Sequence, residues 1–157
     1  MNKQMRTENT IIIHGNISRI FDVAADVLRW PEILPHYRWV KLVEDKGRSR
    51  IVEMAASRDG IPVKWTSIQE SRKEHGKIIF RHIKGPTKGM YVEWNMGLTK
   101  DGAVQVRITH DFRPNWPVLG PFLAEYVVGR FFVHNIAGKT LGRIKEIIET
   151  ENGKKRR

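Results

Sequence analysis

Residues 116–149, WPVLGPFLAEYVVGRFFVHNIAGKTLGRIKEIIE, decide the fold. Apolar side chains recur in this stretch at steps of three to five, which is the spacing of one helical face, and charged side chains occupy the opposite face. Pro121 lies where the first turn of a helix tolerates proline. The stretch therefore predicts one long amphipathic helix, roughly 45 Å long if about thirty residues are helical. Such a helix needs a large apolar surface to cover.

Strand patterns fill most of the chain before this helix. Each is bounded by turn residues such as Lys-Gly, Asp-Gly or Gly-Pro. The predicted order is a strand, a helix, a short helical turn, six antiparallel strands and the long helix. The corresponding ranges are 10–14, 19–28, 30–35, 38–45, 49–57, 61–70, 76–84, 90–99, 103–113 and 116–149.

Alternation along the strands assigns their side chains to two faces, one of them mostly apolar. The long helix has to cover that face. The same face also carries Ser67, Gln69, His82, His110 and, by the alternation of its strand, Arg58. Unpaired buried polar groups are costly, so this set indicates a partly wet pocket of the kind that binds small molecules. The alternative is a closed core in which these groups bond to one another or to ordered water.

Composition limits the class of protein. With 157 residues and 40% hydrophobic residues, we expect one folded domain over residues 10–150, a flexible N-terminus over 1–9 and a basic disordered tail over 151–157. The chain has no cysteine, which excludes disulfides and thiol nucleophiles. It shows no signal-peptide pattern and no uncharged apolar run long enough to span a membrane. These features favour a cytoplasmic location.

The net charge of +11 includes four basic residues at the C-terminus, which leaves +7 on residues 1–153. Because the remaining charges are dispersed, a solvated basic surface is the simplest interpretation. A peripheral contact with an anionic membrane stays open. Binding to nucleic acid or to the ribosome is not favoured but is not excluded. The sequence does not indicate an oligomeric state.

The order of elements resembles the START-like helix-grip fold of the SRPBCC superfamily. The chain is similar to two of its families, the polyketide cyclase/dehydrase family and the coenzyme Q-binding START-domain family. The resemblance implies an α+β domain in which a curved, seven-stranded antiparallel sheet wraps a long C-terminal helix around a ligand cavity. The residues that carry it are 20–21, 26–32, 64–67, 85, 89–94, 132–137 and 140–141.

The resemblance to aromatase/cyclases implies candidate catalytic residues. Tyr37 matches a pocket tyrosine of those enzymes, and Ser67 matches the serine of their Trp-x-Ser-x-Arg strand, in which Gln69 replaces the arginine. A glutamine cannot hold an enolate as a guanidinium does, which weakens the case for cyclase chemistry. His110 and His82 are the candidate acid/base groups, since imidazoles titrate near neutrality. Each could equally be a hydrogen-bonded core histidine.

Large aromatic and flexible side chains are the candidate ligand contacts, although residues of these types more often fill a core. They are Trp30, Met54, Arg58, Trp65, Met90, Trp94, Phe112, Trp116 and Phe131. No clustered metal ligands, phosphate loop or dinucleotide fingerprint are visible, so we expect no metal and no cofactor.

These observations predict a carrier or binding protein for a hydrophobic small molecule, with a polyketide-, quinone- or lipid-like ligand in an internal cavity. The alternative is a polyketide aromatase/cyclase that catalyses aldol cyclisation and dehydration. The first function needs only the apolar cavity, whereas the second needs acid/base groups positioned inside it.

Overall fold

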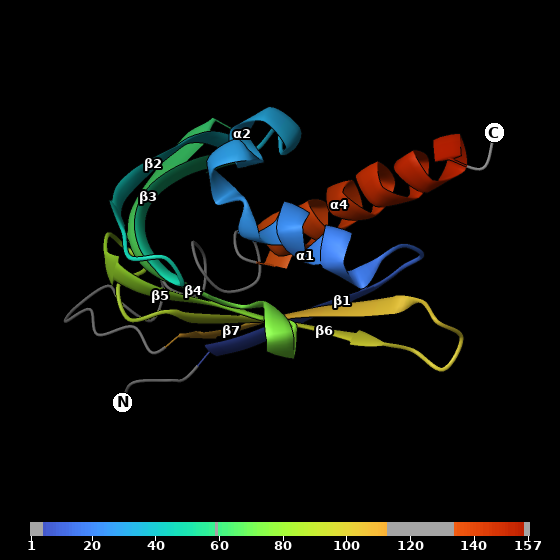
Figure 1. Cartoon of the computed structure of the whole chain (residues 1–157). Coiled ribbons are helices and arrows are strands. Elements are labelled where there is room, and N and C mark those ends of the chain that lie inside the picture. Colours follow the sequence, from blue (N-terminus) through green and yellow to red (C-terminus); the bar gives the residue numbers. More distant parts are fainter. Residues whose placement is uncertain (1–4, 59, 113–133, 156–157) are drawn as a thin grey trace.

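The computed structural model describes residues 5–58, 60–112 and 134–155 (Figure 1). Within these residues seven strands, three α-helices and two short 3₁₀ helices follow one another. They are β1 (Met5–Ile13), α1 (Ile17–Ala25), η1 (Val27–Arg29), α2 (Trp30–Ile33), β2 (Tyr37–Asp45), β3 (Ser49–Arg58), β4 (Ile61–Arg72), η2 (Lys73–His75), β5 (Lys77–Lys84), β6 (Tyr91–Leu98), β7 (Val104–Phe112) and α4 (His134–Lys155).

The seven strands form one antiparallel sheet in the order β1-β7-β6-β5-β4-β3-β2. The only non-sequential pairing is that of β1 with β7, which starts at Met5 opposite Phe112. The sheet is bent, so β2 and β3 arch over the side on which α1, α2 and α4 lie (Figure 1). The predicted helix-grip fold, with its seven strands, C-terminal helix and short helices after the first strand, is confirmed.

Helix α4 lies along β1 and against the inner face of the sheet. Its buried face repeats at helical spacing through Ala137, Leu141, Ile144 and Ile148, each 4% exposed or less. The helix continues to Lys155, six residues beyond the predicted end, and β1 begins five residues before its predicted start. Parts of the segments predicted as flexible ends therefore belong to regular elements. The predicted helical residues 116–133 lie outside the described part of the chain.

Helix α1 begins at a local capping contact, because the side-chain oxygen of Asn16 accepts a hydrogen bond from the backbone N–H of Arg19 at 3.0 Å. Its apolar stripe, including Ile20 and Phe21, is buried against the sheet and α4. On the exposed side, Arg19 pairs with Glu151 at 2.8 Å. The predicted helix over 19–28 is thus split into α1 and η1 by Asp26, whose backbone leaves the helical region.

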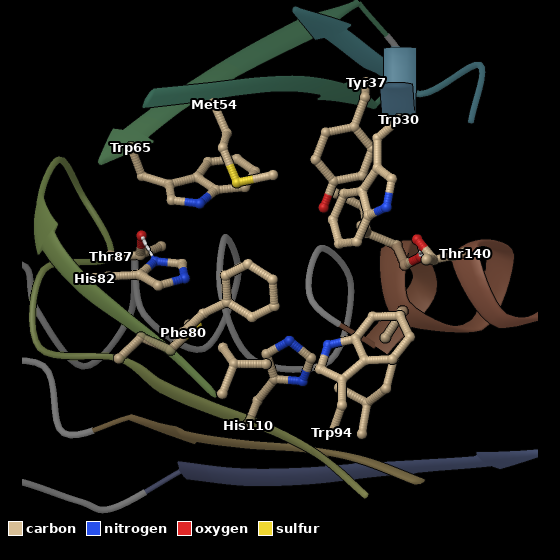
Figure 2. A pocket seen from close by; sticks show the side chains of 15 residues that line it. Trp30, Tyr37, Met54, Trp65, Phe80, His82, Thr87, Trp94, His110 and Thr140 are labelled. Carbon is tan, nitrogen blue, oxygen red and sulfur yellow. Dashed lines mark hydrogen bonds between the residues drawn. The ribbon is translucent and has the colours of Figure 1, made fainter. Parts of the chain in front are cut away.

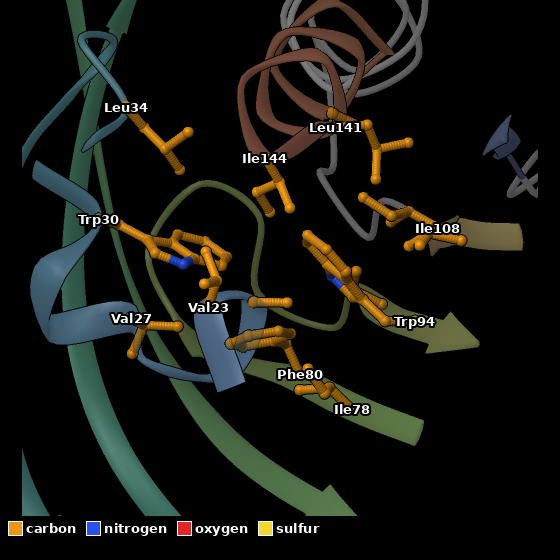
Figure 3. Packing of buried hydrophobic residues seen from close by; sticks show 14 of the residues in the cluster. Val23, Val27, Trp30, Leu34, Ile78, Phe80, Trp94, Ile108, Leu141 and Ile144 are labelled. Atoms are coloured by element: carbon orange, nitrogen blue, oxygen red, sulfur yellow. The ribbon is translucent and has the colours of Figure 1, made fainter. Parts of the chain in front are cut away.

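The predicted alternation of strand faces holds. The inward residues Val63, Trp65, Ser67 and Gln69 of β4 and Val92, Trp94 and Met96 of β6 are buried, whereas Lys64 on the outer face is exposed. Trp30, Phe80 and Trp94 converge with Leu141 and Ile144 of α4 in the centre of the core (Figure 3). Among the described helices, none combines the length and the apolar character that a membrane crossing requires.

Candidate functional site

A cavity lies between the inner face of the sheet, α2 and α4 (Figure 2). Its volume is about 70 Å³, which is room for several waters or for part of a larger ligand. None of its described lining residues is Asp, Glu, Lys or Arg. The lining residues are Trp30, Tyr37, Met54, Trp65, Phe80, His82, Thr87, Met90, Val92, Trp94, Ile108, His110, Ile136, Ala137 and Thr140.

Aromatic rings form most of the wall. The ring of Trp30 lies edge-on to Tyr37, with centroids 5.0 Å apart, and at 6.0 Å from both Phe80 and Trp94. Tyr37 also contacts Trp65 at 6.1 Å. These rings pack against one another and present aromatic surface to the cavity, which favours a flat apolar ligand that can stack on them or meet their edges.

Trp30 and Tyr37 bring hydrogen-bond donors to the wall of this apolar space. They are 3% and 8% exposed, and the Tyr37 hydroxyl points into the cavity, whereas Trp30 Nε1 lies on the side of its ring toward α4 (Figure 2). Trp30 Nε1 has no hydrogen-bond partner among the described residues. Burial raises the pKa of the Tyr37 phenol above its ordinary value, so the hydroxyl keeps its proton at neutral pH. Both groups can donate to an oxygen of a ligand.

His82 is another polar residue of the cavity wall. Its Nδ1 lies 2.6 Å from Thr87 Oγ1, and its ring stacks on Trp65 with an interplanar angle of 2°. Burial lowers the pKa of His82 to about 3, and an electrostatic interaction with His110 contributes in the same direction. His82 is therefore neutral at pH 7. His110 reaches the same cavity from β7, where it pairs in register with Val92.

The loop between β5 and β6 turns Thr87 inward. Gly85 has a φ of +101°, and a Cβ at this position would lie 2.6 Å from the backbone oxygen of Lys64, so only glycine fits without a shift of β4. Backbone hydrogen bonds from Gly89 to His82 and from Met90 to Thr87 close the loop. Residues 85–89 were recognisable in the sequence only as a turn, and no sequence signal identified Thr87 as a cavity residue.

Ser67 and Gln69 share the inward face, as expected, but neither lines the cavity. Gln69 Nε2 donates to the backbone oxygen of Ala25 at 2.8 Å, and its Oε1 accepts a bond from Arg50 at 3.3 Å. The amide thus caps the C-terminal end of α1 instead of facing a ligand. Ser67 is completely buried, and its hydroxyl has no partner among the described residues.

The remaining predicted ligand contacts divide into three groups. Trp30, Met54, Trp65, Met90 and Trp94 line the cavity. Phe112 is 2% exposed and belongs to the apolar core, but it is not a lining residue. The third group lies outside the described part of the chain and comprises the side chain of Arg58 and the whole of Trp116 and Phe131.

Two hydrogen bonds join α4 to Ile33, the last residue of α2, and to His36, which follows α2, and the sequence did not reveal them. Thr140 donates its hydroxyl to the backbone oxygen of Ile136 at 2.8 Å and accepts a bond from His36 Nε2 at 3.1 Å. Arg143 Nε donates to the backbone oxygen of Ile33 at 3.0 Å. Burial, followed by the charge of Lys139, lowers the pKa of His36 to about 4. His36 is therefore neutral at pH 7.

The described residues contain no group of three or more His, Cys, Asp or Glu side chains that could hold a metal ion. The polar groups at the cavity are two imidazoles, a phenol, two hydroxyls and indole N–H groups. These groups can donate hydrogen bonds, and an imidazole can also exchange a proton with a ligand.

A bent antiparallel sheet that holds a C-terminal helix over an apolar cavity defines the START-like helix-grip class. The chain belongs to a family of this class, polyketide cyclase / dehydrase and lipid transport, whose model matches residues 13–128.

Similar proteins share this fold at low sequence identity. A Streptomyces cyaneus protein to which polyketide cyclase activity is ascribed is 26% identical over 117 residues, covering 71% of this chain and 76% of its own length. The crystal structure of the Zhui aromatase/cyclase of a Streptomyces strain matches with a TM-score of 0.84 at 21% identity, covering 94% of each chain. Major latex-like protein 151 of Panax ginseng matches with a TM-score of 0.76 at 14% identity, covering 92% of this chain and 97% of its own.

Proposed function

We propose that the protein binds a flat, hydrophobic small molecule of polyketide, quinone or related lipid type in the cavity between the sheet and α4. The observation that carries this proposal is the aromatic cavity itself, into which the Tyr37 hydroxyl points and beside which Trp30 Nε1 is buried without a partner among the described residues. In a closed structural core such groups are normally paired. A ligand with an oxygen acceptor would pair them and fill the apolar space.

The electrostatics of the cavity favour a neutral ligand. Its described lining carries no acidic or basic side chain apart from histidine, and His82 is neutral at pH 7 because burial lowers its pKa to about 3. A charged ligand would lose its hydration there without gaining an ion pair. Membership of the polyketide cyclase/dehydrase family supports the same ligand class.

Tryptophan fluorescence provides the test, since Trp30, Trp65 and Trp94 line the cavity. Titration with 1,8-dihydroxyanthraquinone should quench this emission in a saturable way. Ala137→Leu, which extends a side chain from α4 into the cavity, should weaken binding by at least tenfold. Thr150→Leu, on the exposed side of the same helix, should leave it unchanged. Equal binding by both variants would contradict a site in this cavity.

An aromatase/cyclase activity is the second candidate. One observation favours it: two histidines and a protonated phenol face the same cavity, so groups able to move protons surround the ligand position. Incubation with a linear poly-β-ketone thioester, followed by chromatography of aromatic products, tests this function. His110→Ala should retain binding and lose product if the protein is an enzyme. Ligand retention without product in the wild type would favour the carrier function.

A further inference from the structure

We propose that Thr87 fixes the tautomer and orientation of His82 at the wall of the cavity. The Nε2–H of His82 then donates a hydrogen bond to a ketone or quinone oxygen of the ligand. This inference deepens the function proposed above and rests on it. It names the chemical group that the ligand must present and the part of the cavity that recognises it.

The direction of the His82–Thr87 hydrogen bond follows from the surroundings of the threonine. Thr87 is 4% exposed, and no second partner of its hydroxyl lies among the described residues. If Nδ1 donated to this oxygen, the hydroxyl proton would remain buried without an acceptor, which is the arrangement that folded proteins avoid. The hydroxyl therefore donates to Nδ1. A neutral imidazole then carries its single proton on Nε2.

Stacking determines where Nε2 points. The His82 ring lies parallel to Trp65, with centroids 5.6 Å apart, so it cannot tilt without losing this contact. With Nδ1 held at 2.6 Å by Thr87, the opposite ring nitrogen faces the open cavity (Figure 2). No protein partner for Nε2 lies among the described residues. The N–H is free to bind an acceptor on a guest molecule.

Two polar groups that face the cavity then carry a proton for the ligand. His82 Nε2 and Tyr37 Oη can each donate to a ligand oxygen, and the Thr140 hydroxyl proton is already used by Ile136. A carbonyl oxygen accepts such hydrogen bonds, and a planar ring system suits the aromatic wall. The ligand class is accordingly a neutral, planar aromatic ketone or quinone.

The tautomer can be measured without a ligand. Long-range ¹H–¹⁵N NMR of histidine-labelled protein at pH 7 should show His82 protonated at Nε2 and unprotonated at Nδ1. Thr87→Val removes the hydroxyl but keeps the shape of the side chain, so the tautomer should become mixed or reverse. Thr87→Ser should restore the wild-type pattern. A His82 protonated at Nδ1 in the wild type would overturn the proposal.

Binding of the matched probes 9-fluorenone and fluorene tests the ligand class, because the two molecules have nearly the same shape and only fluorenone has a carbonyl oxygen. Equilibrium dialysis should show about tenfold tighter binding of fluorenone by the wild type, since one added hydrogen bond of about 1.4 kcal/mol is worth that factor. Thr87→Val should lose most of this preference while retaining fluorene, and Thr87→Ser should keep it.

The outcomes separate this inference from the function on which it rests. If neither probe binds, the cavity is not a site for flat aromatic molecules and the proposed function fails. If both bind equally well to the wild type, the function stands and the carbonyl subsite is refuted. If Thr87→Val weakens fluorene as much as fluorenone, Thr87 supports only the shape of the cavity, and its assigned role is wrong.

Discussion

The side-chain amide of Gln69 binds the protein backbone instead of facing a ligand. It lies in the strand that resembles an aromatase/cyclase motif, yet both ends of its amide are engaged, by Ala25 and by Arg50. Arg50 also donates to the same backbone oxygen, at 2.9 Å. Two strands thus cooperate to cap α1, and the amide has no free donor for a guest molecule.

Replacing Gln69 should therefore affect stability and not binding. Gln69→Leu leaves buried polar groups without their partner, so the free energy of unfolding should fall by about 1–3 kcal/mol. Gln105→Leu on the outer side of β7 should change it by less than about 0.5 kcal/mol. Urea unfolding measures both. A variant of Gln69 with normal stability and lost anthraquinone binding would show that the amide contacts the ligand.

The buried histidines make stability depend on pH. Burial lowers the pKa of His36 to about 4 and that of His82 to about 3, whereas the unfolded chain titrates near 6.5. Below pH 6.5 both imidazoles bind a proton in the unfolded state but remain neutral in the folded state. The free energy of unfolding should therefore fall as pH decreases from 7 to 5. His36→Gln should make this decline shallower. An unchanged slope would contradict the role of His36.

For single residues, the sequence predicted the face of the sheet on which a side chain lies better than it predicted which side chains line the cavity. Alternation placed Ser67, Gln69, His82 and His110 on the inner face correctly, because a strand has only two sides. It could not tell which inward residue reaches the cavity and which is covered by α1, since that depends on the position of a helix distant in sequence. Thr87 was not predicted for a related reason. The orientation of its side chain toward the cavity depends on the conformation of the loop between β5 and β6.

Among the elements, α4 is the one whose fit can be tested most directly. A Cβ at Gly15 would overlap the side chain of Ile148, so the connection between β1 and α1 approaches α4 closely at this glycine. Gly15→Ala should lower the free energy of unfolding by about 1–3 kcal/mol because Ile148 has to move.

Gly142 provides the matched control on α4. It is exposed, and a Cβ there would meet no atom within 4 Å. Gly142→Ala should raise stability by about 0.5–1 kcal/mol, since alanine loses less conformational freedom in a helix than glycine does. Thermal unfolding of the two variants should shift in opposite directions. Shifts of the same sign would argue against the packing of α4 near Gly15.

The order and type of the elements followed from local patterns, and the structure agrees with them wherever it describes the chain. Period-two alternation between Gly-containing turns located β2 to β7, and the helical period located α1 and α4. The ends of elements were less predictable. β1 extends back to Met5 because β7 offers partners as far as Phe112, a long-range effect that a local pattern does not contain.

At the scale of the whole molecule, the cavity is a gap in an otherwise packed core. Its walls lose packing contacts there, so filling it should stabilise the protein. Ala137→Leu should raise the free energy of unfolding by about 0.5–2 kcal/mol while weakening ligand binding. Calorimetry measures the first effect and fluorescence titration the second. A destabilised variant with intact binding would mean that Ala137 does not border usable space.

The two hydrogen bonds that join the end of α2 and the residues after it to α4 also affect how a ligand enters and leaves the cavity. One runs from Arg143 to Ile33, and the other joins His36 to Thr140, which lines the cavity. A guest that departs between these two elements has to break both, however well it fits the aromatic wall. The residence time of the ligand would then depend on these hydrogen bonds, whereas its equilibrium affinity would depend on the aromatic wall. Substitutions at the hydrogen bonds would change the rate of ligand exchange without changing the ligand specificity.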